Sequence, residues 1–375
     1  MRPSVADWRN VARIFSMPDA KPIPAVSTGF LDSHVLQTAR EASLKKRKEL
    51  DEILSAGVGK YASDDSSLVV FGSLARDEWT SGSDLDWTFL IDGTAKPEHF
   101  DIAQEIQKLI AENKEKFPAP GTTGTFGNMA FSHDIVHRIG GQNDSNKNTT
   151  QRILLLLESR PIGKKTEAYD RVIRAVVDRY LEEDTNPLMN DELRYRVPRF
   201  LLNDIARFWR TMAVDFASKQ RGRGGEEWGL RNAKLRMSRK LIFASGLLVC
   251  FSVNLDPELQ NKISTDRNDV RFHLRNYIMN YVRLTPLEIL AKSTKSYAVP
   301  DDVTSALFGA YSDFLKILDN EKSREALKAV RSADSRTDPT FKHIREISGT
   351  FKGALDDIFF ENRQIARLTR EYGVF

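Results

Sequence analysis

The segment Leu68–Asp92, with the sequence LVVFGSLARDEWTSGSDLDWTFLID, decides the fold of this chain. It begins with a short apolar stretch, Leu68 to Phe71, which ends at Gly72-Ser73. A polar connection rich in Gly, Ser and Thr follows, and a second apolar stretch then runs from Asp84 to Ile91. Short apolar runs bounded by Gly and Ser are typical of buried β-strands, so we expect two neighbouring strands here.

The second strand begins with two acids separated by one residue. Side chains on a strand alternate between its two faces, so one face presents Asp84, Asp86, Thr88 and Leu90. The other face presents Leu85, Trp87, Phe89 and Ile91, which is apolar enough to be buried. Two carboxylates this close repel each other, and the repulsion raises the pKa of one of the two carboxyl groups. A divalent cation removes the conflict, and hard oxygen ligands suit Mg²⁺ or Mn²⁺.

Gly72 and Ser73 add a phosphate-binding element beside these acids. A glycine at a strand end lets backbone N–H groups approach a phosphate, and the serine hydroxyl adds a donor. A metal next to a phosphate is the arrangement used for phosphoryl or nucleotidyl transfer. Asp-x-Asp alone would also fit a solvated strand end, but strand, Gly-Ser, polar spacer and Asp-x-Asp in this order is far more specific.

These residues resemble nucleotidyltransferases of the DNA polymerase β superfamily. Over about Leu68–Gly163 the chain is also similar to the nucleotidyltransferase domain of bacterial PII uridylyltransferases. The resemblance implies a third carboxylate on a neighbouring strand, and Asp134 in the predicted strand Met129–Val136 is the preferred candidate. Asp144, in an Asn/Gly/Ser loop, and Glu158 are the competing candidates.

Composition indicates an ordinary soluble protein with room for two domains. The chain has 375 residues, 41% hydrophobic and 29% charged, and a net charge of +4. Its single cysteine, Cys250, excludes an internal disulfide, and we expect a cytoplasmic location. The longest apolar run, Leu241–Val253, is too short to span a bilayer and the N-terminus has no signal-peptide core, so no direct membrane insertion is expected.

Helical periodicity dominates after residue 164. We therefore predict an α+β fold with a polymerase β-like mixed sheet and flanking helices in residues 1–165, and an all-helical domain with a C-terminal tail in residues 166–375. The predicted helices of the second domain are Glu167–Glu183, Tyr195–Ser218, Leu230–Val253, Arg271–Tyr281, Val303–Asp319, Ser323–Ser332 and Ser348–Arg370. The active-site cleft is expected between the two domains.

The segment Arg199–Lys240 is the most basic part of the chain, with eleven Lys or Arg and four Asp or Glu. Within it, Trp228–Asn232 resembles the Gly-Gly-Leu-Arg-Asp segment of the uridylyltransferases and opens a helix. At 100° per residue, Arg231, Lys234 and Ser238 fall on one helical face, which fits binding of a triphosphate or a nucleic-acid phosphate. Helix packing with surface arginines is the alternative.

The expected mechanism is two-metal nucleotidyl transfer with two Mg²⁺ (or Mn²⁺) ions. Asp84 and Asp86 bind both metals, and Asp134 binds mainly the one that activates the acceptor hydroxyl. Gly72 and Ser73, assisted by Ser83, hold the β- and γ-phosphates. Arg231 and Lys234 neutralise the triphosphate tail. The acceptor attacks the α-phosphorus, and pyrophosphate leaves.

Three classes of nucleotidyltransferase-fold protein remain open. In its size and its combination of a sheet domain with a helical domain, the chain resembles cGAS/DncV-like signal synthases of bacterial immunity. Within that class it most resembles the Hailong antiphage enzymes. That resemblance implies polymerisation of dATP (or ATP) into a single-stranded oligonucleotide, primed on the C-terminal tyrosine, here Tyr372, and acting on a downstream membrane effector. The alternatives are a protein-modifying or toxin-type transferase, and an inactive nucleotide-binding module. The base, sugar, acceptor, product length and oligomeric state are not determined by the sequence.

Overall fold

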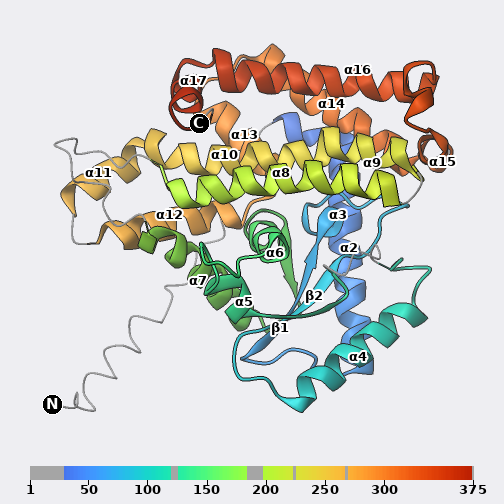
Figure 1. Cartoon of the computed structure of the whole chain (residues 1–375), viewed down its shortest axis with the longest axis vertical. Helices are drawn as coiled ribbons and strands as arrows, with labels where there is room; N and C mark the ends of the chain where they lie inside the picture. Colours follow the sequence, from blue (N-terminus) through green and yellow to red (C-terminus); the bar gives the residue numbers. More distant parts are fainter. Residues whose placement is uncertain (1–28, 120–125, 184–196, 223–224, 267–268, 374–375) are drawn as a thin grey trace.

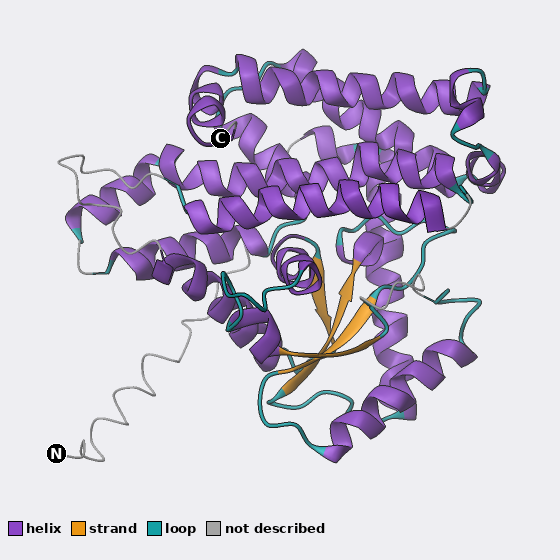
Figure 2. Ribbon diagram, in the orientation of Figure 1, coloured by secondary structure: helices purple, strands orange, loops and turns teal. Residues whose placement is uncertain are grey.

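The computed structural model describes residues 29–119, 126–183, 197–222, 225–266 and 269–373 (Figure 1). A small sheet with helices against both faces lies beneath layers of long helices (Figure 2). The predicted α+β class, with a mixed sheet, flanking helices and a C-terminal helical region, is therefore confirmed. The N-terminal arm and the start of the helix predicted at Tyr195 lie outside the described residues.

The sheet has the strand order β3-β2-β1-β4. Its strands are β1 (Ser66–Phe71), β2 (Trp87–Ile91), β3 (Asn128–Phe131) and β4 (Ser159–Ile162). β1 pairs antiparallel with both β2 and β4, whereas β2 and β3 are parallel. β4 was not predicted because it contains Pro161; as an edge strand it tolerates a proline, which cannot donate to a ladder.

Alternate residues of the two central strands enter two different cores, as their period of two predicts. On one face, Leu68, Val70 and the predicted apolar face of β2 pack against the first helices. On the other face, Val69, Phe71 and Leu90 join the larger core formed with the C-terminal helices. The sheet is therefore buried on both sides, and only the strand ends are free to form a site.

Although no helix was predicted at residues 72–75 or 132–136, the sheet is flanked by helices as expected. They are α2 (His34–Gly57), α3 (Gly72–Ala75), α4 (Pro97–Glu112), α5 (Ser132–Val136) and α6 (Asn146–Leu157). Ser33 caps α2, since its hydroxyl accepts a hydrogen bond from the Leu36 amide. The strand predicted over Met129–Val136 is wrong beyond Phe131, because residues 132–136 turn into α5.

The C-terminal region is helical throughout its described residues. Its main helices are α7 (Glu167–Glu183), α8 (Arg199–Gly222), α9 (Trp228–Lys234), α10 (Lys240–Leu255), α11 (Pro257–Thr265), α12 (Val270–Val282), α13 (Pro286–Ser296), α14 (Asp301–Asp319), α15 (Glu321–Ala329), α16 (Pro339–Asp356) and α17 (Arg363–Leu368). The helix predicted over Leu230–Val253 is confirmed with one interruption, the π-helical segment η2 (Leu235–Arg239) between α9 and α10. α11 and α13, both of which begin with proline, were not predicted.

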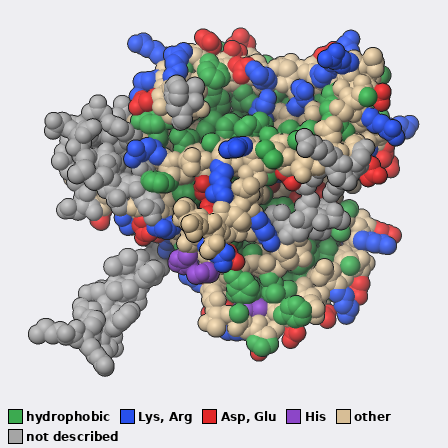
Figure 3. Space-filling view, viewed as in Figure 1, with side chains coloured by type: hydrophobic (Ala, Val, Ile, Leu, Met, Phe, Trp, Pro, Cys, Tyr) green, Lys and Arg blue, Asp and Glu red, His purple; other side chains and the backbone are tan. Residues whose placement is uncertain are grey.

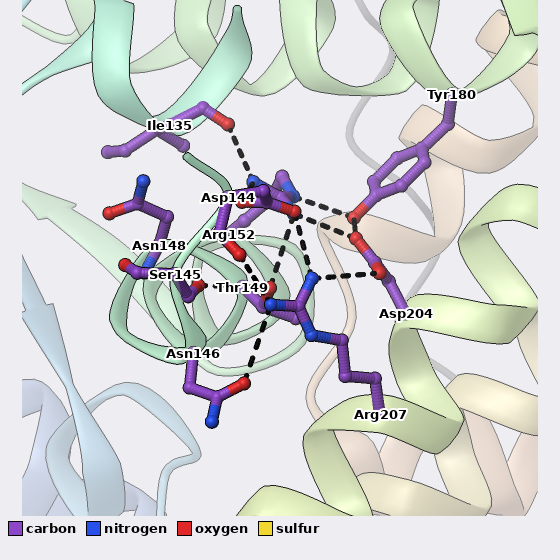
Figure 4. Close-up of polar contacts among 10 residues, drawn as sticks. All are labelled: Ile135, Asp144, Ser145, Asn146, Asn148, Thr149, Arg152, Tyr180, Asp204 and Arg207. Atoms are coloured by element: carbon purple, nitrogen blue, oxygen red, sulfur yellow. Dashed lines mark hydrogen bonds and ion pairs between the residues drawn. The ribbon is translucent and has the colours of Figure 1, made fainter. Parts of the chain in front are cut away.

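A buried network of charges fastens α6 to this helical region (Figure 4). The fully buried Arg152 of α6 donates to the carboxylates of Asp144 and Asp204, each at 2.8 Å, and to the Tyr180 hydroxyl at 2.7 Å. Arg207 of α8 adds a second contact to Asp144 at 3.0 Å. Because each buried charge has an opposite partner, the network joins α6, α7 and α8 without leaving an uncompensated charge.

The continuous helix Trp228–Leu255 is the one described helix that is long and apolar enough to cross a membrane. About 72% of its most apolar window is buried inside the protein, which is the pattern of a core helix. Hydrophobic side chains also gather on the surface of the helical layers (Figure 3). Among the exposed ones, Phe200 and Val214 lie on α8.

Candidate active site

The candidate site lies at the end of β1, where α3 meets the helical layer. Gly72 has a φ of +67°, which favours glycine because an L side chain is strained there. Asp86 packs directly over it, and its Oδ2 atom lies 3.0 Å from the point where a Cβ on Gly72 would be. The backbone of Phe71 also donates to the Asp86 carbonyl at 2.9 Å, which fixes the start of β2 against the end of β1.

Asp84 and Asp86 face a small pocket together with Gly72 and Ser73. Neither carboxylate has a hydrogen bond or ion pair to any described residue. Burial, followed by the neighbouring charge of Asp84, raises the pKa of Asp86 to about 7. Two adjacent carboxylates without a protein partner are an arrangement that a divalent cation would stabilise.

The opposite side of the pocket is basic. Lys234 from α9 and Arg324 from α15 both line it. In the described part of the chain, neither side chain has a hydrogen-bond acceptor or a carboxylate within ion-pair distance. Burial lowers the pKa of Lys234; Asp84 opposes this effect, and Arg324 adds to it. Two cations in one pocket that have no hydrogen-bonded or ion-paired carboxylate form a site for an anion.

The wall of the same pocket includes a largely buried network whose charges are paired. Arg76 contacts Glu78 at 2.8 Å and also bonds Glu158, while Arg239 lies 3.5 Å from the second oxygen of Glu158. The Tyr311 hydroxyl donates to Glu78 at 3.0 Å. This network fixes α3, the start of β4, η2 and α14 around the pocket.

One oxygen of Glu78, Oε1, is buried without a hydrogen-bond partner among the described residues. Burial raises the pKa of Glu78, and the charge of Arg76 opposes this effect. Glu78 also lines the pocket. It is therefore a third carboxyl group within the pocket wall, paired with Arg76.

Two of the predicted serine contacts also line the pocket. The Ser83 hydroxyl accepts a hydrogen bond from the Thr80 amide at 3.0 Å, which stabilises the polar connection before Asp84. Ser238, in η2, lies 3.5 Å from the Tyr311 hydroxyl. The accessible space is about 50 Å³, enough for a few water molecules, so a nucleotide requires the pocket to open.

The structure does not bring Asp134 to the pocket. Because the chain turns into α5 after Phe131, Asp134 lies on a short helix, about half-exposed, and pairs with Arg138 at 2.7 Å. Asp144 is also excluded as the third acid, since Arg152 and Arg207 neutralise it in the buried network of Figure 4. Of the three candidates, Glu158 lies closest to the site: it is buried, and its charge raises the pKa of Asp86.

Arg231 and Tyr372 also lie outside the pocket. The Arg231 guanidinium is turned back toward the start of its own helix and donates to the Glu226 carbonyl. Tyr372 is partly buried in the last described turn, η5 (Thr369–Gly373), and packs against the larger core. Gly373 in the same turn lies near Phe251, and Phe251 is twelve residues after Arg239 on one helix, a separation of about 18 Å along the axis.

Sequence reasoning missed several residues of the site, namely Arg76, Glu78, Arg239 and Arg324. Arg76 and Glu78 lie inside the quoted segment Leu68–Asp92, and two charged residues in a short connection between buried strands were an available signal. Arg324 had none, because it lies in an amphipathic helix without a motif.

The donor set fits a divalent metal in part. No group of three or more His, Cys, Asp or Glu able to hold a metal occurs in the described ranges, so Asp84 and Asp86 are the protein ligands available. Mg²⁺ is commonly bound by one or two carboxylates, with phosphate and water oxygens completing its octahedron. Two carboxylates without a protein partner therefore fit a metal that arrives with its nucleotide.

Comparison with known families supports this interpretation. Residues 47–119 match the family model described as "Nucleotidyltransferase domain". The match includes β1, Gly72-Ser73, the polar connection, Asp84 and Asp86, and this part of the chain is similar to polymerase β-like nucleotidyltransferases. No curated protein matches the chain.

Proposed function

We propose that the chain transfers a nucleotidyl group from a nucleoside triphosphate to a hydroxyl acceptor and releases pyrophosphate. The observation that carries this proposal is the set of four unpaired charges in one pocket: two carboxylates, Asp84 and Asp86, facing two cations, Lys234 and Arg324. Carboxylates without a partner are suited to a metal, and cations without a partner are suited to phosphates. Together they match a metal–triphosphate complex.

Each group has a defined task in this reaction. Asp84 and Asp86 hold the divalent ion, which when bound neutralises phosphate charge and favours deprotonation of the acceptor hydroxyl. Gly72 allows the backbone to approach the phosphates closely, and Ser73 and Ser83 donate hydrogen bonds to them. Lys234 balances the charge of the leaving pyrophosphate. The acceptor oxygen bonds to the α-phosphorus as the bond to the bridging oxygen breaks, and the hydroxyl proton passes to solvent.

The role of a third acid passes in this proposal from Asp134 to Glu158. Glu158 acts through the field that it exerts on Asp86 and through its contact with Arg239. It is a positioning residue, since Arg76 and Arg239 already neutralise it.

The finer proposal concerns the product. The resemblance to cGAS/DncV-like and Hailong-type enzymes supports synthesis of a dATP- or ATP-derived oligonucleotide in cytoplasmic antiphage defence, with a membrane effector downstream. Priming on Tyr372 requires the C-terminal turn to leave its packing against the core. A protein-modifying or toxin-type transferase uses the same pocket with a different acceptor, and an inactive nucleotide-binding module uses it without turnover.

Incubation of the pure protein with Mg²⁺ and each labelled NTP and dNTP tests these proposals. Products are separated on a denaturing gel before and after protease treatment. A dATP ladder that stays with the protein until digestion, and that Tyr372→Phe abolishes, supports tyrosine-primed synthesis. Short free products support a signal synthase, and label on an added second protein supports a modifying enzyme. If none of the eight nucleotides gives a product but nucleotides still bind, the result supports the inactive nucleotide-binding module.

A further inference from the structure

Arg324 has a charged side chain that lacks both a hydrogen-bond acceptor and a paired carboxylate among the described residues. It belongs to α15, which packs against α9, and it is partly buried (Figure 1). Its guanidinium lies directly over Gly82, so that a Cβ on Gly82 would be 2.3 Å from the Nη1 atom. Within the described residues, no oxygen accepts a hydrogen bond from this guanidinium and no carboxylate pairs with it. A guanidinium offers five donors, so a partly buried one without an acceptor is suited to an anionic ligand.

Three hydrogen bonds position the start of α15 beside the polar connection that precedes Asp84. The amide of Ser81 donates to the Asp319 carboxylate, and the Ser81 hydroxyl donates to the Asp319 carbonyl, each at 2.9 Å. Asn320 then caps α15 by accepting from the Ser323 amide at 2.9 Å. The polar connection before Asp84 is thus bonded to the last residue of α14, directly before the residue that caps the helix carrying Arg324.

We propose that Arg324 binds the outer phosphates of the nucleoside triphosphate and, with Lys234, forms the anion half of the site. This inference rests on the proposed function, because it assigns the phosphate end of the same substrate. Planar guanidinium groups bind phosphate oxygens in pairs, which fixes the direction of the chain of phosphates. With the outer phosphates held by α15, the α-phosphate is left beside Asp84 and Asp86.

A side chain at residue 82 would contact Arg324 directly. The φ of Gly82 is not in the left-handed region, so backbone strain does not require glycine at this position. A Cβ at this position would instead meet the Arg324 guanidinium, which is the flexible end of a long side chain and would have to shift. An alanine would push the guanidinium away from its position without removing its charge.

The first test is direct binding of inorganic tripolyphosphate and of Mg²⁺–ATP, measured by calorimetry on the full chain. Arg324→Gln should weaken both at least about tenfold, the effect of losing a charge-assisted contact to phosphate. The matched control is Lys322→Gln, which removes the same charge from the exposed face of the same helix. It should change either affinity by less than about twofold, because solvent screens it.

The second test is a double-mutant cycle with Gly82→Ala. Alone, this substitution should weaken tripolyphosphate binding by displacing Arg324. In the Arg324→Gln background it should have almost no further effect, because the group that it displaces is gone. Additive losses would mean that Gly82→Ala acts through the connection itself, and would count against the proposal. Melting temperatures of all variants identify any that are unfolded.

The outcomes separate the two proposals. If the wild type binds tripolyphosphate and Arg324→Gln binds it equally well, the role of Arg324 is overturned and the proposed function stands. If the wild type binds tripolyphosphate through Arg324 but turns over no nucleotide, the anion site stands and nucleotidyl transfer fails. If the wild type binds neither ligand, both are overturned.

Discussion

Asp86 packs against Gly72 so closely that its Oδ2 atom lies 3.0 Å from where a Cβ on Gly72 would be. The acid that would hold the metal therefore rests on the glycine that would admit the phosphate. Each residue restricts the other, because a larger side chain at residue 72 displaces the carboxylate. The two halves of the sequence motif are thus one geometric unit.

Gly72→Ala should reduce nucleotidyl transfer at least about tenfold, because the new Cβ displaces Asp86 and alanine is strained at a φ of +67°. Gly59→Ala is the matched control, since Gly59 has a φ of +74° and no atom lies within 4 Å of the point where its Cβ would be. Both variants should lose about 1–2 kcal/mol of stability in chemical denaturation. Equal activities for the two variants would contradict the role of the contact.

Asp86→Asn should abolish turnover with little change in the circular dichroism spectrum, because an amide cannot replace the carboxylate as a metal ligand. Asp134→Asn should retain turnover within about twofold, since Asp134 pairs with Arg138 away from the pocket. Steady-state assays of the two variants side by side measure this. Loss of activity in Asp134→Asn would restore that residue as the third acid.

The metal-free protein should lose stability as the pH rises from about 4 to 7. Asp86 has a pKa of about 7 in the folded state, above the usual value of 3.8, so the folded state holds its proton more tightly. The resulting stability is complete below about pH 4 and is lost as the pH passes about 7. Asp86→Asn removes this dependence.

The Asp86→Asn variant should be more stable than the wild type by about 2 to 4 kcal/mol at about pH 8. At about pH 4 the two proteins should have nearly the same free energy of unfolding. Urea denaturation in EDTA at both pH values measures this difference in stability. Saturating Mg²⁺ should reduce the difference at the higher pH. A difference independent of pH would show that Asp86 is not protonated in the folded protein.

Arg76→Met should destabilise the protein by about 3–5 kcal/mol, because it removes the buried cation shared by Glu78 and Glu158. Glu78 would keep only the Tyr311 hydroxyl, and Glu158 only the longer contact with Arg239. The control is Arg171→Met, which breaks an exposed ion pair with Asp92 and should cost less than about 1 kcal/mol. Denaturant titration compares the two. Similar small losses would indicate that water reaches the Arg76 network.

The sequence predicted the parts of the site that local pattern determines. The strand predicted over Asp84–Ile91 begins only at Trp87, so the two acids precede β2 rather than lie in it. The predicted alternation still places Leu85 in the core and Asp86 at the pocket. Of the three residues predicted to share one helical face, Lys234 and Ser238 line the pocket, whereas Arg231 does not.

The remaining parts depend on contacts that no local pattern records. Asp134 was misplaced because a short apolar run fits a strand or a helix equally well, and the chain turns after Phe131. Arg324 is far from Lys234 in the sequence, and only the packing of α15 on α9 brings them together. The π-helical segment η2 likewise has no signal in its sequence, LRMSR.

The core that joins the sheet to the C-terminal helices has a practical consequence for dissecting the chain. Val69, Phe71 and Leu90 share one apolar cluster with residues as distant as Phe351. A fragment ending at residue 165 would expose that face of the sheet and leave Arg152 beside Asp144 without Asp204. We expect such a fragment to aggregate on expression, and the intact chain to melt in one cooperative transition. The chemistry of the strand ends would then be inseparable from the helices that cover them.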